Sequence, residues 1–420
     1  MDAVELMVQV NKVLSIIFIL LYFYQLVFIF VPLFKKYKHK NEPKPHKFAI
    51  LISARNEAAV IGHLINSISQ QNYPQDLITT FVVADNCTDD TAKIARDAGA
   101  VVYERFNKEQ VGKGFALNYL SDRIREDYGT EAFDGFFVFD ADNLLDKDYV
   151  AEMNKTFSDG YNVITSYRNS KNYGDNWISA GYGLWFLREA MYLNRSRALT
   201  KNSCALSGTG FLFSNEIMNR AGGWNFFLLT EDAEFTVYNV LNGEKIGFCE
   251  TAVFYDEQPV TLSQSWRQRL RWSKGYFQVF GKYGGDLFKG VLKGKGFSYY
   301  DMCMTVMPAA FLLSVFAILF NTSMVIYSML FLNDPSVVYF SIMILIRNIY
   351  SWIFLVGAIT TITQWKNIKT TAFKKILYTF TFPIFMFTYI PISCQALFSK
   401  VEWKPIKHDV SISIDQMKVQ

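Results

Sequence analysis

The sequence predicts an α/β domain with a mostly parallel sheet, joined to apolar helices that cross or enter a membrane. Short apolar runs alternate with helical periods between residues 47 and 167, which is typical of strands connected through covering helices. Residues 13–34 form an apolar stretch as long as a bilayer span, and further apolar runs follow residue 299. Hydrophobic residues make up 51% and aromatic residues 17% of the 420 residues, which excludes a disordered chain.

The overall charge and the spacing of metal-binding side chains exclude several classes of protein. A formal charge of +4 is too small for a nucleic-acid-binding protein, and the basic residues lie beside apolar segments, where anionic lipids attract them. The 5 cysteines show no CxxC spacing, so neither disulfides nor a zinc site are expected. The 4 histidines are far apart in the sequence, which argues against a histidine-based metal site.

The first predicted element is a transmembrane helix within residues 1–34. A cleaved signal peptide would carry its positive charge before the apolar run, whereas here the charge follows it. The basic flank places this end of the helix in the cytoplasm, and Pro43 and Pro45 mark a short linker beyond it. The flank consists of Lys35, Lys36, Lys38 and Lys40.

The second predicted unit, residues 35–264, is a cytoplasmic domain built on the sheet. Ligands of such sheets bind at the carboxyl ends of the strands, so polar residues at those ends are the candidate site residues. We expect strands at 48–52, 81–84, 100–103, 136–139 and 163–165, and helices at 58–69, 88–97, 114–125 and 148–157.

The C-terminal part returns to the membrane within residues 301–399. The runs 304–332 and 337–363 are each long enough to span a bilayer. The run 376–398 contains two prolines and leaves two interpretations open: it spans, or it re-enters and keeps the tail 400–420 in the cytoplasm. We favour re-entry, because every basic loop then obeys the positive-inside rule.

Asp140 and Asp142 directly follow the strand predicted at 136–139. Two carboxylates one residue apart at the end of a strand can hold Mg²⁺ or Mn²⁺ and leave positions open for a diphosphate. The alternative is a solvated acidic turn, which is a common feature of proteins.

Further polar residues converge on the same edge of the predicted sheet and favour the first interpretation. Glu57 follows the first strand, and Asp85 follows the strand at 81–84, where a carboxylate can reach a ribose or a base. Lys113 lies between two glycines at the start of a helix, where a cation and free backbone N–H groups suit a phosphate. The alternative for this last motif is an ordinary loop.

Thr230, Glu231 and Asp232 supply a candidate general base for sugar transfer. Inversion at a sugar carbon needs one carboxylate that removes a proton from the acceptor hydroxyl, and Asp232 is our candidate. The alternative is an ordinary helix N-terminus, since this tripeptide is typical of a first helical turn.

Gln268, Arg271 and Trp272 lie at i, i+3 and i+4 and share one face of a predicted helix. Arg271 can stabilise charge on a departing diphosphate, Gln268 can donate and accept hydrogen bonds, and Trp272 offers a flat face for a sugar ring. The alternative is an amphipathic interfacial helix without chemistry, which the composition of residues 265–300 also fits.

These motifs, taken in order, resemble those of the processive family 2 glycosyltransferases, which include cellulose, chitin, hyaluronan and poly-N-acetylglucosamine synthases. The resemblance covers residues 47–284 and implies a GT-A (Rossmann-like) fold, a UDP-sugar donor and inversion at the anomeric carbon. It also implies that the flanking apolar segments are membrane helices. The residues that carry it are Asp85, Asp140-Ala141-Asp142, Thr230-Glu231-Asp232 and Gln268-x-x-Arg271-Trp272.

The resemblance implies a role for each motif. Asp85 would contact the uridine, Asp140 the diphosphate and Asp142 the metal, and Asp232 would act as the general base. The Gln268-x-x-Arg271-Trp272 motif would hold the diphosphate and the terminal sugar of the acceptor. A looser match places Gly208 and Thr209 in a loop at the acceptor site.

We therefore expect an inverting, metal-dependent transferase of the plasma membrane with a cytoplasmic catalytic domain. The first hypothesis is polymerisation of glucose from UDP-glucose into a β-linked polysaccharide, with translocation of the growing glycan and accessory export subunits as further hypotheses. The alternatives are a poly-N-acetylglucosamine synthase, a non-processive glycolipid glycosyltransferase and an inactive binding subunit. The length of the product distinguishes the two polysaccharide synthases from the non-processive glycolipid enzyme.

Overall fold

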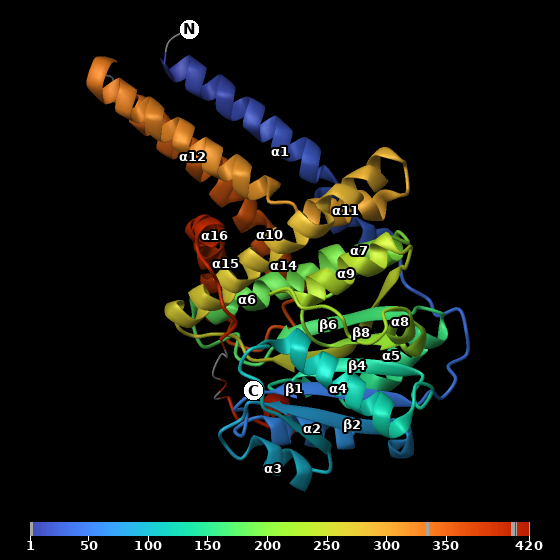
Figure 1. Cartoon of the computed structure of the whole chain (residues 1–420). Helices are drawn as coiled ribbons and strands as arrows, with labels where there is room; N and C mark the ends of the chain where they lie inside the picture. Colours follow the sequence, from blue (N-terminus) through green and yellow to red (C-terminus); the bar gives the residue numbers. More distant parts are fainter. Residues whose placement is uncertain (1–2, 333–335, 405–407, 409, 420) are drawn as a thin grey trace.

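The computed structural model describes residues 3–332, 336–404, 408 and 410–419, and it has two parts (Figure 1). One part is a sheet with helices on both faces, and the other is a group of long apolar helices on one side of the sheet domain. Helices α6 (Trp177–Arg188) and α10 (Leu262–Leu292) lie at the boundary between the two parts. The last described helix, α17 (Ile414–Val419), returns to the sheet domain.

The sheet has eight strands in the order β3-β2-β1-β4-β7-β6-β8-β5. β1 pairs in parallel with β2 and β4, and β2 with β3, so the carboxyl ends of these strands meet at one edge. The prediction of a mostly parallel sheet is right for the half of the sheet formed by β1 to β4. In the other half, β7 runs antiparallel to both β4 and β6. The strands are β1 (Phe48–Ala54), β2 (Ile78–Asp85), β3 (Val101–Arg105), β4 (Gly135–Asp140), β5 (Leu144–Leu145), β6 (Val163–Ser170), β7 (Phe211–Ser214) and β8 (Ile246–Asp256).

The five predicted strands are confirmed as β1, β2, β3, β4 and β6, and the four predicted helices as α2 to α5. Three strands were missed for identifiable reasons. β5 and β7 have two and four residues, too few to show a pattern, and the polar pair Glu250-Thr251 interrupts the apolar run of β8. The helices of this part are α2 (Ile61–Ser69), α3 (Thr91–Asp97), α4 (Lys113–Tyr128), α5 (Tyr149–Ser158), α6 with η2 (Glu189–Asn194) and α7 (Arg195–Leu199), α8 (Asn215–Arg220) and α9 (Glu231–Leu241).

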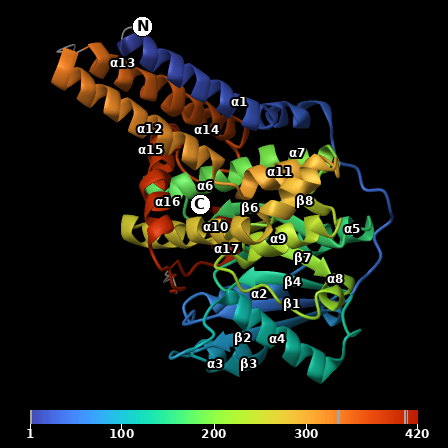
Figure 2. The same ribbon diagram turned by 45° about the horizontal axis from the view of Figure 1, so that its top comes forward.

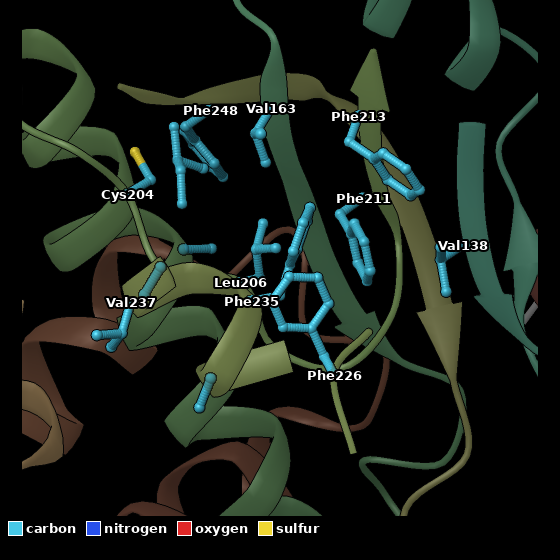
Figure 3. Packing of buried hydrophobic residues seen from close by; sticks show 14 of the residues in the cluster. Val138, Val163, Cys204, Leu206, Phe211, Phe213, Phe226, Phe235, Val237 and Phe248 are labelled. Carbon is cyan, nitrogen blue, oxygen red and sulfur yellow. The ribbon is translucent and has the colours of Figure 1, made fainter. Parts of the chain in front are cut away.

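The sheet is buried on both faces, which explains why its strands read as continuous apolar runs. On one face of the sheet, Ile50 and Ile52 pack against α2. On the other face, Leu51 and Val138 belong to the core that α4 and α9 cover. Figure 3 shows part of the second core, where the rings of Phe211 and Phe235 meet with centroids 6.1 Å apart. This packing fixes α9, and with it the acidic residues at its start.

Among the described residues, three helical stretches are long and apolar enough to cross a membrane: Val4–Phe34, Ala309–Leu332 and Ala372–Phe398. α1 (Ala3–Phe34) and α12 (Ala309–Tyr327) lie side by side in Figures 1 and 2 and are joined by reciprocal Asn11–Asn321 hydrogen bonds of 2.9 and 3.0 Å. The other helices are α11 (Phe297–Val306), η3 (Ser328–Leu332), α13 (Ser336–Leu345), η4 (Ile346–Tyr350), α14 (Ser351–Thr363), α15 (Ala372–Phe387) and α16 (Tyr389–Phe398).

The stretch Ala372–Phe398 is interrupted at Thr388, between α15 and α16, and both of its ends contact the sheet domain or α10. At the start, Lys374 Nζ donates to the carbonyl of Gly174 at 2.6 Å. At the end, Trp266 Nε1 of α10 donates to Gln395 Oε1 at 2.6 Å. The chain after α16 then follows the sheet edge, where Ile414 and Met417 pack against Leu144 and Tyr255.

Candidate active site

A cavity of about 1000 Å³ begins at the carboxyl ends of β1, β2 and β4 and continues between the apolar helices. Every site residue expected from the sequence lines this cavity except Thr209. Thr209 is buried under the turn after β4, where its Oγ1 accepts a hydrogen bond from the backbone N–H of Asp140 at 2.9 Å. Thr209 therefore supports the turn instead of facing the acceptor side. The lining site residues are Glu57, Asp85, Lys113, Asp140, Asp142, Gly208, Thr230, Glu231, Asp232, Gln268, Arg271 and Trp272.

The turn after β4 carries two carboxylates with different environments. Asp140 forms an ion pair with Lys113, whose Nζ also donates to the carbonyl of Gly208 at 2.7 Å. Asp142 is only 4% exposed, and its Oδ2 accepts a hydrogen bond from the backbone N–H of Glu257 at 2.8 Å. Burial alone would raise the pKa of Asp142, but the positive charge of His408 and Lys171 holds this pKa below its ordinary value.

The residues around this turn fit a hard divalent cation. Burial, together with the charges of Asp142 and Asp140, raises the pKa of Glu57, as expected for an excess of negative charge. Within the described ranges, no group of three or more His, Cys, Asp or Glu forms a preassembled metal site. Asp140 and Asp142 would therefore hold Mg²⁺ or Mn²⁺ together with oxygens from a bound diphosphate, a donor set that both ions accept.

The ends of β1 and β2 hold strained polar residues beside this turn. Asp85 is 4% exposed and pairs with Arg105, with Oδ1 and Nη1 2.6 Å apart. Asn56 and Asn86 adopt left-handed backbone conformations with φ of 58° and 54°. Non-glycine residues in this region cluster at functional sites, because the surrounding structure must stabilise them.

The acidic residues at the start of α9 face the cavity. Burial, followed by the charge of Asp232, raises the pKa of Glu231 to about 7, and burial also raises the pKa of Asp232. Thr230 makes no side-chain capping hydrogen bond, and its hydroxyl is buried without a partner in the described chain. The Thr230 side chain therefore does not cap the helix, and burial raises the pKa of Asp232, the direction expected of a general base.

The loop before β7 approaches Asp232 closely. Gly208 has a φ of 82°, and a Cβ at this position would lie 3.9 Å from Asp232 Oδ2. A side chain at residue 208 would therefore be strained and would narrow the cavity beside the candidate base.

On α10 the predicted face points into the cavity. Gln268 Oε1 is buried without a hydrogen-bond partner in the described part of the chain, and Arg271 Nη1 donates to the carbonyl of Leu229 at 2.8 Å. The Trp272 ring meets Tyr182 edge-on at 5.7 Å. Arg269 faces the other way and is fully buried, with Nη1 donating to Thr388 Oγ1 at 2.6 Å. The predicted face of α10 therefore lines the cavity, and a role for it in binding or chemistry stays a prediction.

Several cavity residues were not found from the sequence. Arg168 lies over the Phe186 ring at 3.6 Å and pairs with Asp256, whose pKa burial raises to about 6. His408 comes from the C-terminal tail, and its Nδ1 lies 3.0 Å from both carboxylate oxygens of Glu57. Asp256 ends β8 as Asp85 and Asp140 end their strands, but β8 itself was not predicted from the sequence. His408 could not be found from the sequence, since no local pattern places the tail.

The tail contributes more than His408 to this edge. The Arg55 guanidinium lies 5.6 Å from the ring centre of Trp403, and both Trp403 and Lys404 line the cavity. Although burial alone would lower it, the charges of Asp142 and Glu57 raise the pKa of His408 to about 10. The imidazole is therefore protonated at neutral pH and partly offsets the negative charge of the cluster.

Comparison with known proteins agrees with this geometry. Residues 45–275, more than half of the chain, match the model of the family described as Glycosyltransferase like family 2. Beta-monoglucosyldiacylglycerol synthase from Synechocystis is 28% identical over 232 residues, 55% of this chain and 48% of that protein. Poly-beta-1,6-N-acetyl-D-glucosamine synthase from Staphylococcus epidermidis is 23% identical over 233 residues, 55% of each chain. The chain thus spans about half the length of these curated relatives.

A solved structure shares the fold over nearly the whole chain. The mannosyltransferase PcManGT from Pyrobaculum calidifontis, in complex with GDP-Man and Mn²⁺, covers 94% of this chain and 98% of its own with a TM-score of 0.60 and 15% identity. The expected GT-A fold is confirmed, and so is the resemblance at the level of the family, while the processive subclass stays a prediction. The chain belongs to glycosyltransferase family 2.

Proposed function

We propose that this protein is a membrane-embedded, inverting glycosyltransferase that transfers a hexose from a nucleotide sugar to a hydroxyl of a membrane lipid. The observation that carries this proposal is the continuity of the cavity. Its polar end holds the acidic cluster, and its other end is lined by apolar residues of α1, α12 and α14. Phe18, Phe23 and Trp352 line it and are each more than 40% exposed, which suits access from the lipid side.

The chain's own residues account for each part of the transfer. Asp232 takes the proton from the lipid hydroxyl, and the oxygen attacks the anomeric carbon from the side opposite the diphosphate. Arg271 and Lys113 stabilise the charge on the departing diphosphate. A divalent cation, when bound at Asp140 and Asp142, would neutralise part of that charge.

For the donor we propose a UDP-sugar, with UDP-glucose as the first choice. Support for uridine comes from the resemblance of the motif set to the processive family 2 glycosyltransferases, in which the position of Asp85 implies a contact with the uridine. Support for glucose comes from the relatives named as monoglucosyldiacylglycerol synthases.

The proposed topology places the sheet domain in the cytoplasm, where nucleotide sugars are made. α1, α12 and the run 336–363 cross the membrane, and Lys35 and Lys36 lie at the cytoplasmic end of α1. Ala372–Phe398 enters and returns, because Lys374 near its start and Gln395 near its end both contact the sheet domain or α10.

A polysaccharide synthase is the second candidate. The same motif set and the similarity to the Staphylococcus epidermidis enzyme support it. Of the two, the lipid acceptor accounts better for a cavity whose second half is apolar, since a growing glycan is polar along its whole length.

Radiolabel transfer by the purified protein in lipid nanodiscs tests the proposal. The assay would offer UDP-glucose, UDP-N-acetylglucosamine, UDP-galactose and GDP-mannose with Mg²⁺ or Mn²⁺, diacylglycerol and glycosyl-diacylglycerol. We expect label from one donor in a chloroform-soluble product that is absent with Asp232→Asn and with chelator. Label in a long, glycosidase-sensitive polymer would overturn the lipid acceptor and establish the second candidate.

A further inference from the structure

Among the helices that line the cavity are α10 and α6 with η2, at the boundary between the sheet domain and the apolar helices. On α10, Gln268, Trp272 and Tyr276 repeat every four residues, so they share one face, and all three line the cavity. Tyr276 therefore continues the motif face by one further helical turn. The second helix, α6 with η2, contributes Trp185 and Glu189.

Glu189 begins a π-helical turn, Glu189–Asn194, between α6 and α7. Such turns are rare and occur frequently at functional sites. The Glu189 carboxyl lines the cavity but makes no hydrogen bond or ion pair with any described residue. Burial is the main cause of the raised pKa of Glu189; the charges of Arg197 and Arg168 act in the opposite direction, and the charge of Asp232 adds to the rise. Glu189 is therefore a half-buried cavity acid whose carboxyl has no hydrogen-bond donor among the described residues.

Tyr276, on α10, also has a polar group that makes no hydrogen bond with a described residue. Its ring is packed among neighbours, yet its hydroxyl has no hydrogen-bond partner among the residues that the structure describes. Burial, followed by the charges of Asp232 and Glu189, raises the pKa of Tyr276. The Phe186 and Trp272 rings, about one turn earlier on the two helices, have centroids 6.2 Å apart, so the helices face each other here. Glu189 and Tyr276 both line the cavity, and the charge of Asp232 acts on both.

Neighbouring polar groups show that this lack of partners is unusual. Arg188 Nη2 donates to Gln25 Oε1 of α1 at 2.7 Å and lies over the Trp185 ring at 5.0 Å. Glu234, a buried acid of α9, accepts hydrogen bonds from the backbone N–H groups of Phe227 and Leu228, each at 3.0 Å. Glu234 shows how a buried acid of this domain is paired by backbone donors, whereas an acid that faces the cavity without a described hydrogen-bond donor points to a ligand.

We infer that Glu189 and Tyr276 form an acceptor subsite that binds a polyol headgroup. A carboxylate accepts hydrogen bonds and a phenol donates or accepts one, which matches neighbouring hydroxyls of a glycerol or a sugar. The inference rests on the proposed function and narrows its acceptor to lipids that have at least one hydroxyl besides the reacting one. Glu189 and Tyr276 hold that second hydroxyl while the first meets Asp232.

Two acceptors in detergent micelles test the subsite: dioleoylglycerol, which has one free hydroxyl, and monoglucosyl-dioleoylglycerol, which has several. We expect the wild type to show a kcat/KM about 10-fold or more higher for the glucosylated lipid, the effect of one charge-assisted hydrogen bond. Glu189→Gln and Tyr276→Phe should each remove most of this ratio by raising the KM for the glucosylated lipid, with the donor KM unchanged. Glu189→Asp should retain part of the ratio.

Glu244→Gln is the matched control, because Glu244 undergoes the same chemical change outside the cavity, where it pairs with Arg220 at 2.8 Å. It should leave the ratio unchanged, and thermal melts of all variants would show that the fold persists. A wild type that labels lipids without a preference, or a Glu189→Gln variant that slows both acceptors equally, would overturn the subsite alone. A wild type that labels no lipid and extends only sugar oligomers would overturn the proposed function together with the subsite.

Discussion

Two ion pairs of this molecule show how the same chemistry serves structure in one place and the site in another. Arg197 and Asp301 are 1% and 0% exposed, and the guanidinium meets the carboxylate through two hydrogen bonds of 2.6 and 2.9 Å. Tyr24 of α1 donates to the same carboxylate at 2.9 Å. The pair thereby links α7, α11 and the N-terminal apolar helix with every charge matched.

The pair of Lys113 and Asp140 is different because its charges are not matched. Glu231 and Asp232 add negative charge next to Lys113, and burial raises the pKa of both against the charges of Lys113 and Arg271. The difference indicates which groups hold the fold and which await a substrate.

Replacement of the candidate base should have the largest effect on the rate. We expect Asp232→Asn to lower kcat by about 10²–10⁴-fold, because the acceptor hydroxyl loses its proton acceptor. The melting temperature should not fall, because a buried carboxylate with a raised pKa destabilises the fold at neutral pH. Initial rates at saturating donor, with a thermal melt, would check both effects. A variant that retains a tenth of the rate would remove Asp232 from this role.

Breaking the matched pair should give the opposite pattern. Arg197→Met leaves Asp301 buried without its partner, at a cost of about 3–5 kcal/mol in the free energy of unfolding. The expected result is a strongly lowered melting temperature in detergent. The control is Arg197→Met with Asp301→Leu, which should recover part of the loss. Equal stability of single and double variants would contradict a matched pair.

Removing one unmatched charge should shift the pH dependence. The pKa of Glu231 near 7 means that the acidic pair gains a proton as the pH falls through neutrality, so the rate should fall on the acid side. In Glu231→Gln, Asp232 no longer faces a neighbouring carboxylate, and the acid limb of kcat/KM should move to lower pH. A pH profile between 5 and 9 would measure the shift. An unchanged limb would mean that the pair is not coupled.

The tail contact should have the smallest effect. His408→Gln removes a positive charge from Glu57, and the expected result is a several-fold rise in the donor KM with little change in kcat. The matched control is His39→Gln, because His39 lies 2.8 Å from Asp159 outside the cavity. A loss of kcat at saturating donor would show that His408 acts in the chemistry instead.

The sequence predicted the parts of the site that follow regular patterns. Asp85 and Asp140 end apolar strands of the parallel half of the sheet, and Gln268 and Trp272 follow the helical period, so topology alone brings them together. Asp256 was missed because polar residues interrupt β8. His408 and Glu189 were missed because their places depend on long-range packing of the tail and on a π-helical turn, which local patterns do not encode.

The most direct test of the account is to block the apolar half of the cavity. Ala317 of α12 lines it, and Ala317→Trp should abolish transfer to a diacyl lipid while the rate with a short-chain, water-soluble acceptor remains. The control is Leu319→Trp on the same helix, which is 63% exposed and does not line the cavity. Loss of both activities in Ala317→Trp with an intact fold, or loss of neither, would contradict a lipid acceptor that reaches Asp232 through this cavity.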